Sequence, residues 1–216
     1  MKTPDYLTIQ NYYDLKGKPA STVNELIHIC EIVTGTPKDE ILTWEKKEVE
    51  TFVNAVIDLF GGKEPTFYPI FDFKDVTYGF QPLSKMTLGE WADLETYAKD
   101  YEGNLHKIMA IIYRPITKHN WKNPIWKAKH NLKLWQSKVV SPFETYDVED
   151  YNIETYNDRV ELFKELPAEI AKGAMVFFLS LGLKYSNHTL TSSLQLSPQV
   201  KAKMLLMEQQ MLKQYQ

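Results

Sequence analysis

The sequence predicts a mainly α-helical protein with one small β-hairpin, an α+β fold. Apolar residues recur at helical spacing along most of the 216 residues, and several of these runs begin with a capping pattern and end at glycine or proline. Between 67 and 80 the apolar period changes to two, which is typical of paired strands. With 44% hydrophobic residues, the chain can bury a substantial core.

The first segment, 1–62, is predicted to be a helical subdomain. Thr22 and Glu25 stand three apart before an apolar run, which is the pattern of a capping box, and Gly35 ends that run. Residues 5–16 fit either a strand or a turn of helix. Three helices are expected: 23–33, a short one from Pro37 to Leu42, and a longer one from Thr43 to about Phe60.

The second segment, 63–115, begins with the hairpin. Its turn is expected at Lys74 and Asp75, between an alternating run that starts at Phe67 and one that ends at Phe80. Pro69 cannot donate a ladder hydrogen bond, so the first strand is predicted to lie at the edge of the sheet.

A helical pair completes the second segment. Thr87 and Glu90 form another capping box, and Gly103 is expected to let the first helix end in a left-handed conformation. A second, almost wholly apolar helix follows, with Arg114 closing its last turn and pairing with Asp93. The apolar stripe of the first helix comprises Leu88, Trp91, Leu94, Ala98 and Tyr101.

The remaining segments are 116–157, an irregular insertion, and 158–216, a set of helices. Pro167 is expected to separate a first helix from an apolar core helix that starts near Ala168, and a final amphipathic helix is expected from Ser197. That last helix is more apolar than a free terminal helix should be, so it is predicted to dock on a partner or on the core. Its candidate contact residues are Met204, Leu205, Met211 and Leu212.

Charge is unevenly distributed along the chain, whose net charge is −3. Residues 1–113 carry 11 Lys against 18 Asp and Glu, whereas 114–138, here named the basic island, carry one Arg and six Lys with no acid. Three tryptophans are interleaved with these lysines. The candidate binding residues are Lys118, Trp121, Lys122, Trp126, Lys127 and Lys129.

Three interpretations of the basic island stay open. Cations and aromatic rings together suit single-stranded nucleic acid. They also suit an acidic patch on a partner protein or the acidic stretch that follows at 144–150. The third interpretation is a charged loop without a binding function.

No catalytic, metal or cofactor motif emerges, and no cofactor is expected. Glu90, Asp93 and Glu95 are explained by helix capping and the helix dipole. The single cysteine, Cys30, falls among apolar residues, which favours a small core residue and a reducing compartment. The sequence shows neither the start of a signal peptide nor an apolar run long enough to cross a bilayer.

Residues 78–80, 86–95 and 104–115 resemble a pattern found in structural-module proteins of large tailed bacteriophages, including phages of Bacteroidetes. These are proteins of the tail or baseplate assembly and chaperone kind, and 173–178 is a second, weaker match. The resemblance implies a non-enzymatic virion or assembly role, with other phage proteins as partners and a homo-oligomer or nucleic acid as alternatives. It places the protein in the cytoplasm of the infected bacterium or in the virion, with no membrane partner.

Overall fold

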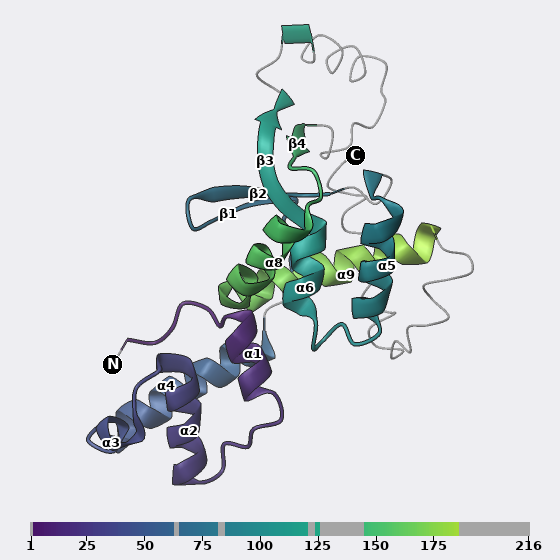
Figure 1. Ribbon diagram of the computed structural model, residues 1–216. Helices are drawn as coiled ribbons and strands as arrows, with labels where there is room; N and C mark the ends of the chain where they lie inside the picture. The colour runs from purple at the N-terminus through teal and green to yellow at the C-terminus, as the bar shows by residue number, and fades with distance from the viewer. Residues whose placement is uncertain (1, 63–64, 82–84, 121–123, 126–144, 186–216) are drawn as a thin grey trace.

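The computed structural model describes residues 2–62, 65–81, 85–120, 124–125 and 145–185, the last seven of these by their backbone only. It confirms the mainly helical α+β fold (Figure 1). The helices are α1 Ile9–Leu15, α2 Val23–Thr34, α3 Lys38–Ile41, α4 Lys46–Gly61, α5 Leu88–Ala98, α6 Leu105–Ile112, α8 Ile153–Leu162 and α9 Ala168–Tyr185, with a 3-10 turn η4 Phe163–Glu165. The strands are β1 Ile70–Phe73, β2 Val76–Phe80, β3 Tyr113–His119 and β4 Tyr146–Val148.

Helices α2, α3 and α4 form an N-terminal lobe around its own apolar cluster, which includes Ile27, Phe52 and Val56. The capping box at Thr22 is confirmed, because its hydroxyl accepts from the Glu25 amide and the Glu25 carboxylate accepts from the Thr22 amide. Gly35 ends α2 with φ 69°, a conformation that glycine adopts without steric cost. Thr43, the expected cap of the longer helix, does not cap it, because α4 begins at Lys46 with Glu45 as its N-cap.

A larger lobe contains the sheet and helices α5, α6, α8 and α9, around a second apolar cluster. Helix α6 lies at its centre and contacts α5, α8 and α9 (Figure 1). Every residue of α6 except Lys107 is buried, as its apolar sequence predicts. Among the described residues, no helix combines the length and apolarity that a membrane span needs.

Helix α1 joins the two lobes, and it resolves the ambiguity at 5–16 in favour of helix. Thr8 caps it through a capping box with Asn11, where asparagine stands in place of the usual Glu or Gln. Ile9 belongs to the larger cluster and Leu15 to the N-terminal one. Beside α1, the Leu166 carbonyl accepts from the Ile9 amide at 2.9 Å, which fixes the chain start on the connection before α9.

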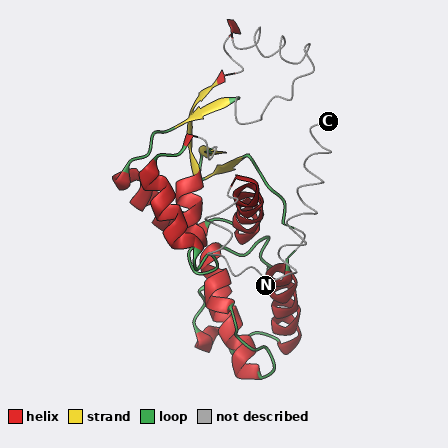
Figure 2. Cartoon of the chain, turned by 90° about the vertical axis from the view of Figure 1, so that its right-hand side faces the viewer, coloured by secondary structure: helices red, strands yellow, loops and turns green. Residues whose placement is uncertain are grey.

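The predicted hairpin is part of a four-stranded antiparallel sheet in the order β1-β2-β3-β4. Lys74 and Asp75 form its turn with φ of 47° and 63°, and β1 is an edge strand, as Pro69 predicts. Figure 2 shows part of the sheet projecting beyond the helices, while Phe71 of β1 and Tyr78 and Phe80 of β2 belong to the larger apolar cluster. The prediction that the chain is irregular directly after 115 was wrong, because β3 continues to His119 and pairs with β4.

Three local predictions in the helical pair were also wrong. Helix α6 ends at Ile112, so Arg114 lies on β3; Pro115 disfavours a helical conformation for the residue before it. Gly103 is not left-handed, and α5 has already ended at Ala98. Leu88 is 87% exposed and lies outside the buried stripe.

The C-terminal part agrees with the expected break at Pro167 and with a core helix that starts at Ala168. Helix α8 starts earlier than expected, because Asn152 accepts from the Glu154 amide at 2.8 Å and caps Ile153–Leu162. The predicted final helix from Ser197 lies outside the described residues.

Candidate functional site

Of the residues predicted to bind a partner, the structure places Lys118, which is exposed on β3. The others lie outside the described residues: Trp121, Lys122, Trp126, Lys127, Lys129, Met204, Leu205, Met211 and Leu212. Charged side chains also come together in two other places. One is a polar network that connects α5, β3 and α8, and the other is a pocket between the lobes.

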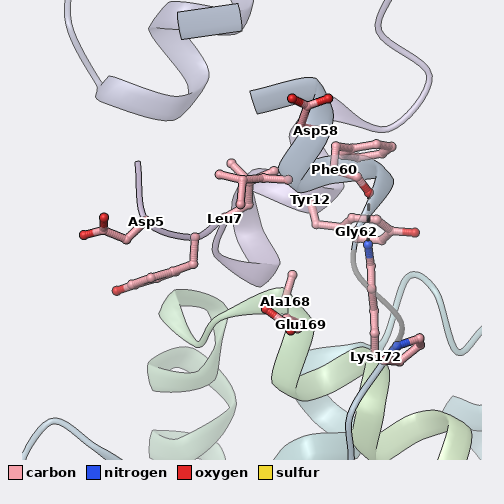
Figure 3. A pocket seen from close by; sticks show the side chains of 12 residues that line it. Asp5, Leu7, Tyr12, Asp58, Phe60, Gly62, Ala168, Glu169 and Lys172 are labelled. Carbon is pink, nitrogen blue, oxygen red and sulfur yellow. Dashed lines mark hydrogen bonds between the residues drawn. The ribbon is translucent and has the colours of Figure 1, made fainter. Parts of the chain in front are cut away.

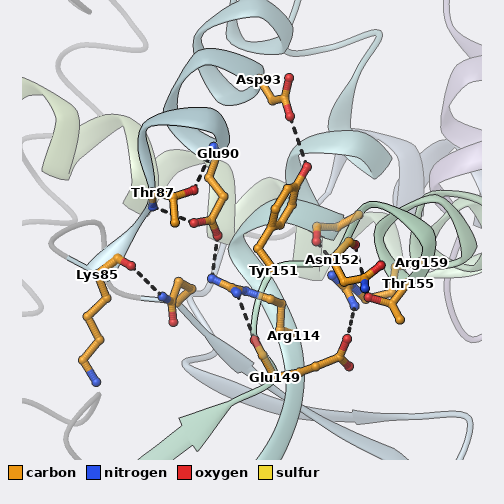
Figure 4. A network of polar contacts seen from close by, with 12 residues as sticks. Lys85, Thr87, Glu90, Asp93, Arg114, Glu149, Tyr151, Asn152, Thr155 and Arg159 are labelled. Atoms are coloured by element: carbon orange, nitrogen blue, oxygen red, sulfur yellow. Dashed lines mark hydrogen bonds and ion pairs between the residues drawn. The ribbon is translucent and has the colours of Figure 1, made fainter.

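The polar network is built on the capping box of α5 (Figure 4). One oxygen of Glu90 accepts from the Thr87 amide at 2.6 Å, and the other accepts from Arg114 Nη2 at 2.6 Å. The second nitrogen of the guanidinium, Nη1, donates to the Glu149 carbonyl oxygen at 2.9 Å. Arg114 therefore links the start of α5 to the segment after β4.

A second arginine extends this network to α8. Arg159 Nε donates to the Ala110 carbonyl oxygen at 3.3 Å, and its Nη1 lies 3.4 Å from Glu149 Oε1. Burial lowers the pKa of both Arg159 and Arg114, while the acids beside them oppose the shift.

Asp93 has a different partner from the predicted one. The Tyr151 hydroxyl donates to Asp93 Oδ2 at 3.1 Å, and burial, followed by this hydrogen bond, raises the pKa of Tyr151 to about 12. The expected Arg114–Asp93 ion pair is replaced by Arg114–Glu90.

A cavity of about 330 Å³ lies beside Arg114. It is lined by Gln81, Lys85, Arg114, Tyr146, Asp147, Val148, Glu149 and Asp150. Three of these residues are acidic, so the cavity does not favour an anion even though Arg114 lines it. Within the described part of the chain, Arg114 Nε and Arg159 Nη2 are buried without a hydrogen-bond partner.

The second place, here named the α4–α9 pocket, is a cavity of about 320 Å³ between the lobes (Figure 3). It is lined by Asp5, Tyr6, Leu7, Tyr12, Asp58, Leu59, Phe60, Gly62, Pro65, Ala168, Glu169 and Lys172. These residues come from the N-terminal segment, α1, the end of α4 and the start of α9. The pocket therefore exists only when both lobes are assembled.

Lys172 crosses the α4–α9 pocket from α9 to α4. Its Nζ lies 4.2 Å from the ring centroid of Tyr12 and 5.5 Å from that of Phe60, and it donates to the Phe60 carbonyl oxygen at 3.3 Å. These are cation–π contacts plus a hydrogen bond at a helix C-terminus, where carbonyls lack helical donors. The ammonium of Lys172 is therefore engaged by its own chain.

Other reactive groups are engaged in packing. Cys30 is fully buried, and burial raises the pKa of its thiol to about 11, so it is a core residue and not a nucleophile. His106 Nδ1 lies 2.8 Å from the Tyr13 hydroxyl at the junction of α6 and α1. No three or more His, Cys, Asp or Glu side chains gather in a way that suits a metal within the part of the chain that the structure describes.

One feature of the sequence points to the α4–α9 pocket. Lys172 is the single cation between 168 and 183, a stretch that is otherwise mostly apolar. A lone cation on a core helix needs a specific partner, because burying it unpaired is costly. That partner, the aromatic pair on α1 and α4, lies more than 100 residues away in sequence and could not be inferred.

Comparison with protein-family models, curated proteins and solved structures found no match.

Proposed function

We propose that this protein is a non-enzymatic structural or assembly protein of a tailed bacteriophage, of the tail or baseplate kind, that acts through protein–protein contacts. The proposal starts from the resemblance carried by 78–80, 86–95 and 104–115. In the fold these segments are β2, α5, α6 and β3, which pack against one another as one unit. The residues that carry the resemblance are thus spatially contiguous.

The single observation that carries the proposal is a buried ion pair inside this unit. Glu90 and Arg114 bind each other in the interior, with side chains 1% and 4% exposed, and Glu90 also caps α5. Such a pair fixes the crossing of helix and strand. A rigid body of this kind suits a subunit that presents fixed surfaces to its neighbours.

A direct test is cross-linking mass spectrometry on infected cells that carry a tagged copy of the protein. We expect cross-links to virion or assembly proteins, both in particles and in intermediates. A matched variant lacking 198–216 should lose these partners while the rest stays folded, because the predicted C-terminal helix is a candidate anchor. If the full-length protein enriches no phage structural or assembly protein, the proposal fails.

The alternative function is binding of single-stranded nucleic acid. The basic island favours it, with seven cations and no acid over 25 residues, and the exposed Lys118 stands at its described end. Phosphate binding would make log K fall with log salt by about 0.7 per phosphate contacted. A triple variant, Lys122→Gln/Lys127→Gln/Lys129→Gln, should then reduce the slope by roughly 2. Salt-independent or absent binding to oligo-dT would exclude this function.

A further inference from the structure

We infer that the α4–α9 pocket is the docking site for the basic island of a second copy of this chain. The inference rests on the proposed function, because it names a protein partner for one surface of an assembly protein. It follows from the charge of the pocket, its aromatic lining, and the position at which the basic island leaves the fold.

The open side of the α4–α9 pocket is negatively charged. Asp5, Asp58 and Glu169 line it and are exposed, so a partner can reach all three (Figure 3). The pocket includes the C-terminal end of α4, with partial negative charge, and the first turn of α9, with partial positive charge, so the two helix dipoles oppose each other and the carboxylates decide the sign. Among the described lining residues, Lys172 carries the one positive charge, and its Nζ is already bound by Phe60 and Tyr12. Lys2 lies 3.6 Å from Asp5 in an ion pair of two exposed side chains, which leaves Asp58 and Glu169 as the main negative charges. The pocket thus retains a net preference for a cation.

The pocket lining is aromatic as well as acidic. Tyr12 and Phe60 are stacked with ring centroids 5.1 Å apart, and Tyr6, which also lines the pocket, is 47% exposed. The ammonium of Lys172 already occupies these two rings, so they offer a partner apolar surface and not a further cation site. The fitting occupant therefore combines lysine side chains, whose stems pack on rings, with aromatic or apolar neighbours.

The basic island has this chemistry. Between 118 and 138 it alternates six lysines with Trp121, Trp126 and Trp135 and contains no acid. Protein interfaces commonly match a positive segment to a negative one, which sets orientation and speeds association. The 1–113 part of the chain, which supplies most of the pocket, carries 11 Lys against 18 acids.

The geometry favours a second copy over the same chain. The basic island begins on β3, and Asn120, after the outer end of that strand, donates from its amide to the carbonyl oxygen of Thr145, just before β4, at 2.9 Å. Figure 1 places these strand ends away from α1 and the end of α4, where the pocket lies. A contact from one copy's island to the next copy's pocket is head-to-tail, and such interfaces build rings or filaments. Either assembly suits the proposed role.

The first experiment uses a labelled peptide of residues 118–138 as the probe and fluorescence anisotropy on the full-length protein. We expect saturable binding that weakens with salt. The double variant Asp58→Asn/Glu169→Gln should bind roughly fivefold to tenfold more weakly, because two exposed charges are lost. The matched control Asp39→Asn/Glu40→Gln removes two exposed acids from α3, outside the pocket, and should change affinity little.

If the control and the pocket variant lost affinity for the peptide to the same extent, the inference would be overturned, because binding would then follow net charge alone. Unchanged binding in the pocket variant would overturn it as well. A peptide with Lys122, Lys127 and Lys129 replaced by Gln should not bind.

The second experiment is sedimentation velocity on the full-length protein. We expect concentration-dependent association that 0.5 M salt and the pocket variant both weaken, roughly in line with the Debye length shrinking from about 10 Å at 0.1 M towards 3 Å at 1 M. A monomer at all concentrations overturns the inference. If the protein stays monomeric yet cross-links to virion proteins, only this inference fails; if it self-associates but has no virion partner, only the proposed function fails.

Discussion

Arg114 Nη2 lies 2.6 Å from Glu90 Oε1, and through this contact one carboxylate both caps α5 and holds β3. The other oxygen of Glu90 accepts from the Thr87 amide, also at 2.6 Å. The two residues are 24 apart in sequence and on different kinds of element. The ion pair therefore fixes the angle between a helix and a strand, and each buried charge is compensated by the other.

Removing one partner of this pair should destabilise the protein strongly. Arg114→Met leaves the Glu90 charge buried without its cation, and we expect it to cost about 3 to 5 kcal/mol of unfolding free energy. The double variant Glu90→Gln/Arg114→Met should cost less than Arg114→Met alone, because the amide can still cap α5 without a buried charge. Urea unfolding monitored by circular dichroism measures both.

The matched control for this prediction is Glu95→Gln. Glu95 is an exposed acid on the same helix, so its replacement should change stability by no more than about 0.5 kcal/mol. If Arg114→Met and Glu95→Gln had the same effect, the ion pair would contribute little and the prediction would be wrong.

The Glu90–Arg114 pair also shows what the sequence could and could not predict here. The capping box at Thr87 was predictable, because its two residues are three apart and each satisfies a backbone donor of the other. The arginine's partner was not, because choosing between Glu90 and Asp93 depends on where α6 ends. That helix ends at Ile112, two residues before the point that the sequence suggested.

Stability should fall as the pH is lowered from about 6.5 to about 4, because of His106. Burial lowers the pKa of His106 to about 4, so in this range the unfolded chain binds a proton that the folded protein does not. The Tyr13 hydroxyl accepts from the His106 amide at 3.3 Å and lies 2.8 Å from Nδ1, so the buried ring has a hydrogen-bond partner within the fold. The loss should approach about 3 kcal/mol at pH 4.

Unfolding titrations at several pH values test this. His106→Gln should flatten the stability profile between pH 6.5 and 4, whereas His28→Gln, at an exposed histidine on α2, should leave the slope unchanged. A slope that persists in His106→Gln would assign the pH dependence to other groups.

Gly173 should not tolerate alanine. A Cβ at this position of α9 would collide with the backbone carbonyl of Thr66, and a backbone atom cannot move aside as a side chain can. We expect Gly173→Ala to cost about 1 to 3 kcal/mol through overpacking. Gly89→Ala is the control, because the nearest atom to its Cβ would be Thr87 Oγ1 at 4.0 Å; it should be neutral or stabilise by up to about 1 kcal/mol.

The elements that the sequence predicted are those with local signals. Thr22, Thr87 and the Lys74-Asp75 turn each carry their cue within a few residues. The pairing of β3 with β4 has no such cue, because 26 residues separate His119 from Tyr146 and a three-residue strand shows no period. The α4–α9 pocket is likewise formed by segments distant in sequence, so only the fold reveals it.

We expect the Tyr146 side chain to hold β4 on the sheet. Its ring lies over Gly79, where any Cβ would collide with it, and its hydroxyl hydrogen is shared between the carbonyl oxygens of Phe80 at 2.9 Å and Pro69 at 3.1 Å. Tyr146→Phe keeps the ring but removes a donor from the Phe80 carbonyl, while the Pro69 carbonyl still accepts from the Phe80 amide at 2.9 Å, so we expect a loss of about 0.5 to 1.5 kcal/mol. Hydrogen exchange should then rise first in β4 and the facing part of β3, while α2 and α4 keep their protection.

The control for this prediction is Tyr68→Phe, which changes an exposed tyrosine before β1 and should leave exchange in β4 unchanged. Uniform exchange across the sheet in Tyr146→Phe would instead mean that β4 is held by its backbone pairing with β3 and not by this side chain.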